Sequence, residues 1–135
     1  MLNTQDIQVN AKTIYDIAPE DMLSYFHRRY DGIVVPKEID FFQLTKVEQM
    51  LALIANEKGY LNFMKSIADI MTRSYKAAGD KEKYASAVCK KNIIDNYIDT
   101  LESKNKAISR MLTVYQLERE DINYENRMAG AVYGA

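Results

Sequence analysis

Three kinds of side chain in this sequence could do chemistry: one imidazole, one thiol and two groups of carboxylates. His27, in the run Phe-His-Arg-Arg-Tyr, could act as a general base or contact a phosphate. A base needs a partner that orients it, and we find none near His27 in the sequence, so we interpret His27 as a solvated residue that complements a helix C-terminus. Cys89 precedes Lys90 and Lys91, which is weak support for a reactive thiolate, and we interpret it as a part-buried or surface thiol.

Two carboxylate groups fall at helical spacing: Asp95, Asp99 and Glu102, and then Glu118, Asp121 and Glu125. Hard cations need converging oxygens, and dinuclear bundle sites also need a Glu-x-x-His motif, but His27 has no Glu three residues before it. The sequence has no Gly-rich phosphate loop, no Ser-centred nucleophile elbow and no Cys/His metal spacing. We therefore interpret both carboxylate groups as solvated faces and expect no enzyme activity, no metal and no cofactor.

Composition is that of one ordinary globular domain: 135 residues, 47% hydrophobic and 27% charged, with a net charge of −1. This balance gives no overall attraction to nucleic acid or to an anionic membrane, and no apolar run approaches the roughly 20 residues of a membrane span. The first residues lack the basic and apolar segments of a signal peptide. A single Cys excludes an intrachain disulfide, so we expect a reducing, cytoplasmic location.

Residues 1–44 read as an N-terminal arm, a short helix and a packing loop. The arm shows no sustained period. A helix is predicted from Pro19, a residue that suits the first helical position, to a stop at Gly32. The following residues, 33–44, are strongly apolar and include Phe41 and Phe42, so we expect this loop to pack against another surface.

Residues 45–135 predict two long helices. Thr45 to Glu48 matches a capping box, and apolar residues then follow steps of three and four from Val47 to Ala78. Gly79 suits a helix end and Asp80 a new helix cap. A column spaced by seven continues: Ala87, Ile94, Leu101, Ile108, Tyr115, Ile122 and Ala129. Because the connection is so short, the fold class is all-α, a long antiparallel helical hairpin that resembles a coiled coil.

The second long helix, predicted from Lys81 to about Met128, must overhang the first. We expect its end to be covered by the N-terminal 44 residues, by another subunit, or by both. The candidate interaction residues are Asn105, Tyr115, Ile122, Tyr124, Met128, Phe41 and Phe42. Glu57 and Asn105 are polar residues at core positions, and either meet across the hairpin, where Glu57 could also meet Lys104, or point partly to water.

These patterns favour a non-enzymatic assembly or adaptor protein that self-associates or binds other subunits by helix-to-helix contact. Within that class we favour a structural component of a multi-subunit particle such as a phage virion, because the chain is small and has no evident catalytic site. The alternative is a helical accessory subunit of a replication, recombination or RNA-guided complex. Its candidate nucleic-acid contacts are Arg28, Arg29, Lys104, Lys106 and Arg110, with Lys90 and Lys91 more loosely associated.

Overall fold

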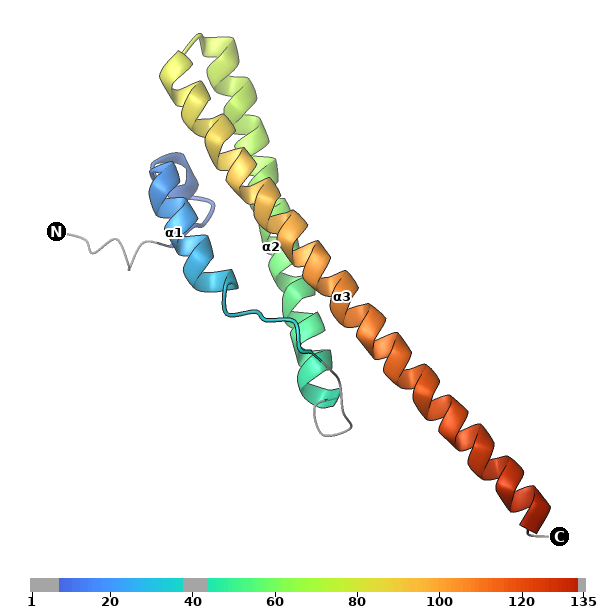
Figure 1. The fold of residues 1–135 in the computed structure, drawn as a ribbon. Helices are drawn as coiled ribbons and strands as arrows, with labels where there is room; N and C mark the ends of the chain where they lie inside the picture. Colours follow the sequence, from blue (N-terminus) through green and yellow to red (C-terminus); the bar gives the residue numbers. More distant parts are fainter. Residues whose placement is uncertain (1–7, 38–43, 134–135) are drawn as a thin grey trace.

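The protein, described here by a computed structural model, is all-α over residues 8–37 and 44–133, with side chains placed up to Met128. A short 3-10 turn, η2 (Thr13–Tyr15), is followed by α1 (Pro19–Tyr30), α2 (Leu44–Ala78) and α3 (Lys81–Tyr133). Helices α2 and α3 form the predicted hairpin, and α1 lies along one side of it (Figure 1). Within the described part of the chain there is no strand.

Helix α1 begins at Pro19 as predicted, with Glu20 and Asp21 in its first turn. It ends at Tyr30, two residues before the expected stop at Gly32. Its buried face turns toward the hairpin and consists of Met22, Phe26 and Tyr30. Beyond the helix Ile33 is buried and Val35 packs against the core, but Val34 is 66% exposed, so the expected packing of the apolar loop holds for only part of its described residues. Phe41 and Phe42 lie outside the described residues.

The turn between the long helices follows the sequence prediction closely. Gly79 has φ +73°, and its N–H donates to the carbonyl of Lys76, while the N–H of Asp80 donates to the carbonyl of Tyr75. This pair of bonds is a Schellman motif, which needs a left-handed residue at the position of Gly79. The Asp80 side chain then accepts a hydrogen bond from the Lys83 N–H (3.1 Å) and caps α3. At the other end, α2 begins at Leu44, so Thr45 lies inside the first turn and is not the N-cap residue that the expected capping box requires.

Three ion pairs fix the register of the hairpin. Their nitrogen-to-oxygen distances are 3.6 Å for Lys58–Glu102, 2.9 Å for Lys65–Asp95 and 3.1 Å for Lys91–Asp69. The residue numbers in each pair add up to 160, which means that the two helices run antiparallel without a slip. The same rule places Leu44, where α2 begins, beside residue 116 of α3.

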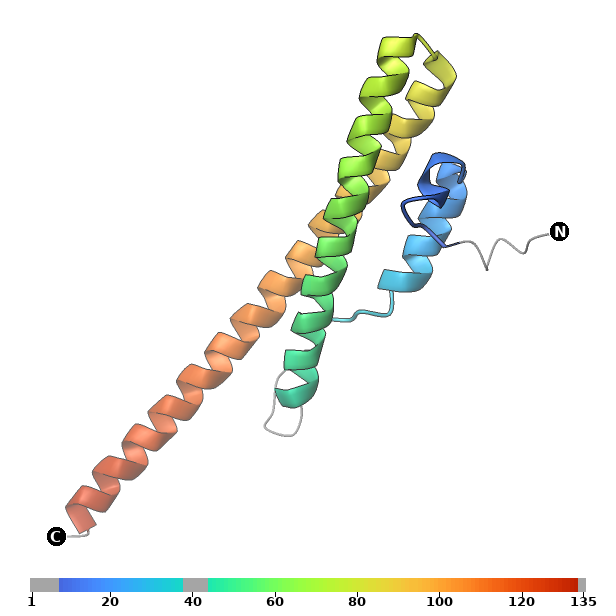
Figure 2. The same cartoon turned by 180° about the vertical axis from the view of Figure 1, so that it is seen from behind.

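Helix α3 therefore continues well past α2 (Figures 1 and 2). It has 53 residues, about 80 Å at 1.5 Å per residue. We call residues 114–133 the α3 tail. The described N-terminal residues do not cover it, because every residue from 116 to 128 is exposed. The hydrogen bonds between these N-terminal residues and α3 lie farther back, at Lys90 with Ile14 and at Lys104 with Tyr30. We expected the end of α3 to be covered by residues 1–44, by another subunit, or by both. The described part of residues 1–44 does not cover it.

Candidate interaction surfaces

The seven-spaced column of α3 is buried inside the hairpin and emerges into solvent on the tail. Ile94, Leu101 and Ile108 are fully buried against α2. Tyr115 is half-buried at the level where α2 begins, and Ile122 is 57% exposed. The apolar pattern thus continues for two turns beyond the helix that covers it. We call Tyr115 and Ile122 the tail inner column.

A second apolar row runs along the tail at steps of three and four. It comprises Val114, Leu117, Asp121, Tyr124 and Met128, whose four apolar members are all at least half exposed. Residues at this spacing share one helix face, and the helical positions of this row lie roughly opposite the inner column. We call it the tail outer seam. Sequence reasoning identified Tyr124 and Met128 but missed Val114 and Leu117, although the spacing of the row was present in the sequence.

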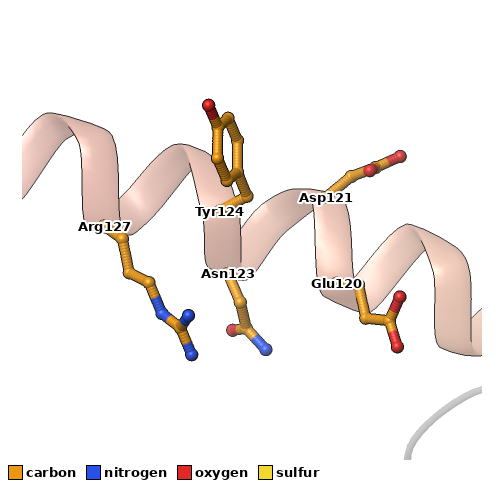
Figure 3. Close-up of a pocket in the computed structure, with 5 residues that line it drawn as sticks. All are labelled: Glu120, Asp121, Asn123, Tyr124 and Arg127. Atoms are coloured by element: carbon orange, nitrogen blue, oxygen red, sulfur yellow. The ribbon is translucent and has the colours of Figure 1, made fainter.

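The polar side chains of the tail form no enclosed site. Figure 3 shows Glu120, Asp121, Asn123, Tyr124 and Arg127 around a shallow depression on a single helix. They project from this one helix in different directions, and no second described element contributes to the lining. A hollow with a wall on one side only offers a ligand little burial. Among the described residues, the tail therefore forms no enclosed small-molecule pocket.

Glu57 joins α1 to α2 through three hydrogen bonds. Its carboxylate accepts two hydrogen bonds from the Arg29 guanidinium, both 2.8 Å, and a third of 2.8 Å from the Tyr30 hydroxyl. Arg29 also donates to the Tyr25 hydroxyl (2.7 Å). Burial alone would raise the pKa of Glu57, but the hydrogen bonds from Arg29 and Tyr30 and the guanidinium charge hold it below its ordinary value. Burial, and then the bond to Glu57, raises the pKa of Tyr30.

The predicted contact of Glu57 across the hairpin is replaced by this contact with α1. Lys104 donates instead to the backbone carbonyl of Tyr30 (3.4 Å), so Glu57 and Lys104 both bond to Tyr30. Asn105 is half-buried, and its side-chain oxygen accepts a bond from the Ser109 hydroxyl on its own helix (3.0 Å). The prediction considered only the two long helices, whereas α1 supplies the partner of Glu57.

Lys90 is the one buried charged residue in the described part of the chain, at 2% exposed. Its ammonium group donates to the carbonyls of Ile14 (2.8 Å) and Tyr15 (3.2 Å) and so anchors η2 to α3. Burial lowers the pKa of Lys90. A small cavity of about 80 Å³ beside Lys90 is lined by Tyr15, by Asp16 and by side chains of α2 and α3 near the turn that joins these helices. Sequence reasoning treated Lys90 as part of a loose basic patch, although its position three residues after Ala87 and four before Ile94 signalled a core place.

The structure does not bring the imidazole, the thiol and the carboxylate groups together into one site among the described residues. His27 is exposed and bonds through Nδ1 to the carboxylate of Asp31 (2.8 Å), a partner four residues on that sequence reasoning missed. Cys89 is exposed. Among the described residues no group of three or more His, Cys, Asp or Glu side chains could hold a metal ion. Two members of the first carboxylate group, Asp95 and Glu102, pair with lysines of α2.

The five basic residues of the nucleic-acid alternative are not equally available. Arg29 is bonded to Glu57, and Lys104 is half-buried against Tyr30. Arg28, Lys106 and Arg110 are exposed. Lys106 and Arg110 are four residues apart and share a face of α3.

Comparison of the chain with protein-family models, with curated proteins and with solved structures finds no match. Among the described helices, none has a stretch long and apolar enough to cross a membrane.

Proposed function

We propose that this protein is a non-enzymatic assembly or adaptor protein that associates with itself through helix-to-helix contacts of the α3 tail. The observation that carries this proposal is the apolar column of α3, which is buried through Ile108 and 57% exposed at Ile122. Water-exposed apolar rows of this length on one helix are typical of surfaces that another protein covers.

Helix energetics support the same proposal. An isolated helix of about 20 residues is only marginally stable in water, because most helical stability in proteins comes from packing of an apolar face. The tail has no such packing against the described residues, and its two apolar rows lie on different faces of the helix. A helix with two apolar faces is suited to a position between two neighbours. A multi-subunit assembly supplies both.

The finer assignment within this class is a structural subunit of a particle such as a phage virion, assembled in a reducing cytoplasm. Small size, the absence of any converging catalytic group among the described residues and the exposed, unpaired Cys89 support it.

Sedimentation equilibrium tests the proposal. We expect the average mass of the wild-type chain to rise with concentration across the micromolar range. Ile122→Glu should reduce this association at least tenfold, because it places a charge in the inner column. Asn123→Glu is the matched control, since it adds a negative charge at the next position, also exposed, but outside both apolar rows. A wild-type chain that stays monomeric throughout this range contradicts the proposal.

The nucleic-acid alternative is tested separately by titration at two salt concentrations. Binding through Arg28, Lys106 and Arg110 must weaken steeply as salt rises, because phosphate contacts release counterions. Absence of binding, or binding insensitive to salt, excludes this alternative.

A further inference from the structure

Helix α2 carries an exposed row that matches the tail outer seam in spacing. It follows steps of four and three, and every member is exposed: Gly59, Phe63, Ser66, Ile70, Arg73 and Ala77. We call this row the α2 outer seam. Phe63 and Ile70 are each 57% exposed, and the row has no charged residue until Arg73. It is separate from the face of α2 that packs on α3, which contains Leu61, Met64 and Ala68.

The two ends of the molecule carry opposite charge. The closed end of the hairpin, residues 73–83, has four basic residues against two acidic ones, a net charge of +2. The α3 tail has four acidic residues against two basic ones, a net charge of −2. A tail therefore repels the tail of a second copy and attracts its closed end.

If Asp121 lies opposite Arg73, the two seams match step for step only in the antiparallel direction. In this arrangement the spacing of four, three and four residues from Leu117 to Met128 coincides with the same spacing from Ala77 back to Ser66. Three further pairs in this register are apolar or small: Leu117 with Ala77, Tyr124 with Ile70, and Met128 with Ser66. Val114 falls opposite Asp80, beyond the end of α2. In the parallel direction, with Asp121 still opposite Arg73, the position opposite Tyr124 is Lys76, which is not in the α2 outer seam.

We infer that the α3 tail of one copy docks antiparallel on the α2 outer seam of a second copy, with Asp121 opposite Arg73. This inference rests on the proposed self-association and names its partner surface. In this register the small residues Ala77 and Ser66 lie opposite the larger Leu117 and Met128, which allows the two helices to approach closely.

This contact joins two different surfaces, so it leaves one free tail and one free α2 outer seam at the ends of every chain of subunits. Such head-to-tail contacts produce open filaments, or rings if the rotation closes. By the register of the hairpin, Arg73 lies at the level of residue 87 of α3, and Asp121 lies 34 residues farther along that helix. Successive subunits are therefore displaced by about 50 Å along α3, at 1.5 Å per residue. This displacement places the closed end of one copy level with the start of α2 in the next, so the two hairpins meet nearly end to end along the tail.

A mixing experiment with two full-length double variants tests the inference. The tail variant, Leu117→Glu/Tyr124→Glu, keeps an intact α2 outer seam, and the seam variant, Phe63→Glu/Ile70→Glu, keeps an intact tail. All four positions are exposed, so both variants should keep the circular dichroism and melting temperature that the wild type has in dilute solution. We expect polymers for the wild type, monomers for each variant alone, and a heterodimer that grows no further in an equimolar mixture.

Each other result has a distinct meaning. If the wild type polymerises and the seam variant polymerises equally well, the docking surface is wrong while the proposed self-association stands. If both variants are monomeric and the mixture is monomeric too, the pairing of these two surfaces is wrong. If the wild type itself is monomeric, both the inference and the proposed function fail.

Charge reversal tests the register. Asp121→Arg and Arg73→Asp should each raise the dissociation constant about tenfold, and the double variant that carries both should return it to within about threefold of the wild type. Glu120→Arg makes a comparable change of charge at the adjacent position, outside the seam, and combined with Arg73→Asp it should give less rescue. Equal rescue by Asp121→Arg and Glu120→Arg would overturn the register.

Discussion

The carboxylate of Glu57 accepts hydrogen bonds from Nε and Nη2 on one edge of the Arg29 guanidinium, both 2.8 Å, and the two residues lie 28 positions apart on different helices. The Glu57 side chain is only 13% exposed, and the Arg29 side chain is 39% exposed. Together with the Tyr30 hydroxyl, this pair fixes α1 on the hairpin at one position along α2. It is therefore the polar contact whose loss should be most visible in the stability of the fold.

Replacing Glu57 by Gln should lower the free energy of unfolding by about 1–2 kcal/mol. The change leaves a partly buried guanidinium without its counter-charge, although remaining solvent contact of Arg29 reduces the cost. Urea unfolding followed by circular dichroism measures this difference. Lys58→Gln, which breaks the longer and more exposed pair with Glu102, is the control and should cost less than about 1 kcal/mol. Equal effects of the two substitutions would show that the Arg29 pair has no special role.

Acidification should remove the contribution of Glu57. Because the folded-state pKa of this carboxyl lies below its ordinary value of 4.5, its stabilisation is fully present above that pH and is lost as the pH falls through the folded-state pKa. The stability difference between the wild type and Glu57→Gln should therefore shrink between pH 7 and pH 3. Urea titrations at these two pH values measure it, and a difference that grows at low pH would contradict the assigned direction.

The hairpin was predictable because its signals are local and repeated. Steps of three and four, Gly79 at the turn and Asp80 at the cap each act within a few residues, and the structure has all of them. The partners of Glu57 and Lys90 were not predictable in this way. They depend on where residues 8–37 dock, and docking is set by tertiary packing of Phe26, Tyr30 and Tyr97, whose rings lie 5.4–5.7 Å apart. The helix lengths in the sequence were enough to predict that the end of α3 extends past α2. To find the outer seam of the tail and a matching row on α2, one needs the exposed fraction of each side chain, which only the structure gives.

Two isoleucines in one seven-spaced column should respond differently to truncation. Ile94→Ala should cost about 2–4 kcal/mol because Ile94 is fully buried and the substitution leaves a cavity. Ile122→Ala should change the free energy of unfolding of the dilute monomer by less than about 0.5 kcal/mol because Ile122 is exposed. Denaturant unfolding below the association range measures both. A large cost at Ile122 in the monomer would mean that the chain covers its own tail.

Replacing each of two glycines by Ala should change the stability of the hairpin in opposite directions. Gly79→Ala should destabilise the hairpin by about 1 kcal/mol, because φ +73° is unfavourable for a residue with a Cβ. Gly59→Ala should stabilise it by about 0.5–1 kcal/mol, because Gly59 lies inside α2 with no atom within 4 Å of an added Cβ. Thermal melts of the two variants at low concentration test this pair, and destabilisation by Gly59→Ala would show that this position is already in contact with another segment.

Hydrogen exchange of the tail amides as a function of protein concentration tests the central claim most directly. If another copy covers the tail, amides of residues 114–128 should exchange rapidly in dilute solution and become protected by at least tenfold as concentration rises, while the amides around Ile94 and Leu101 stay protected throughout. Tail amides that exchange at the same rate at every concentration would contradict the account.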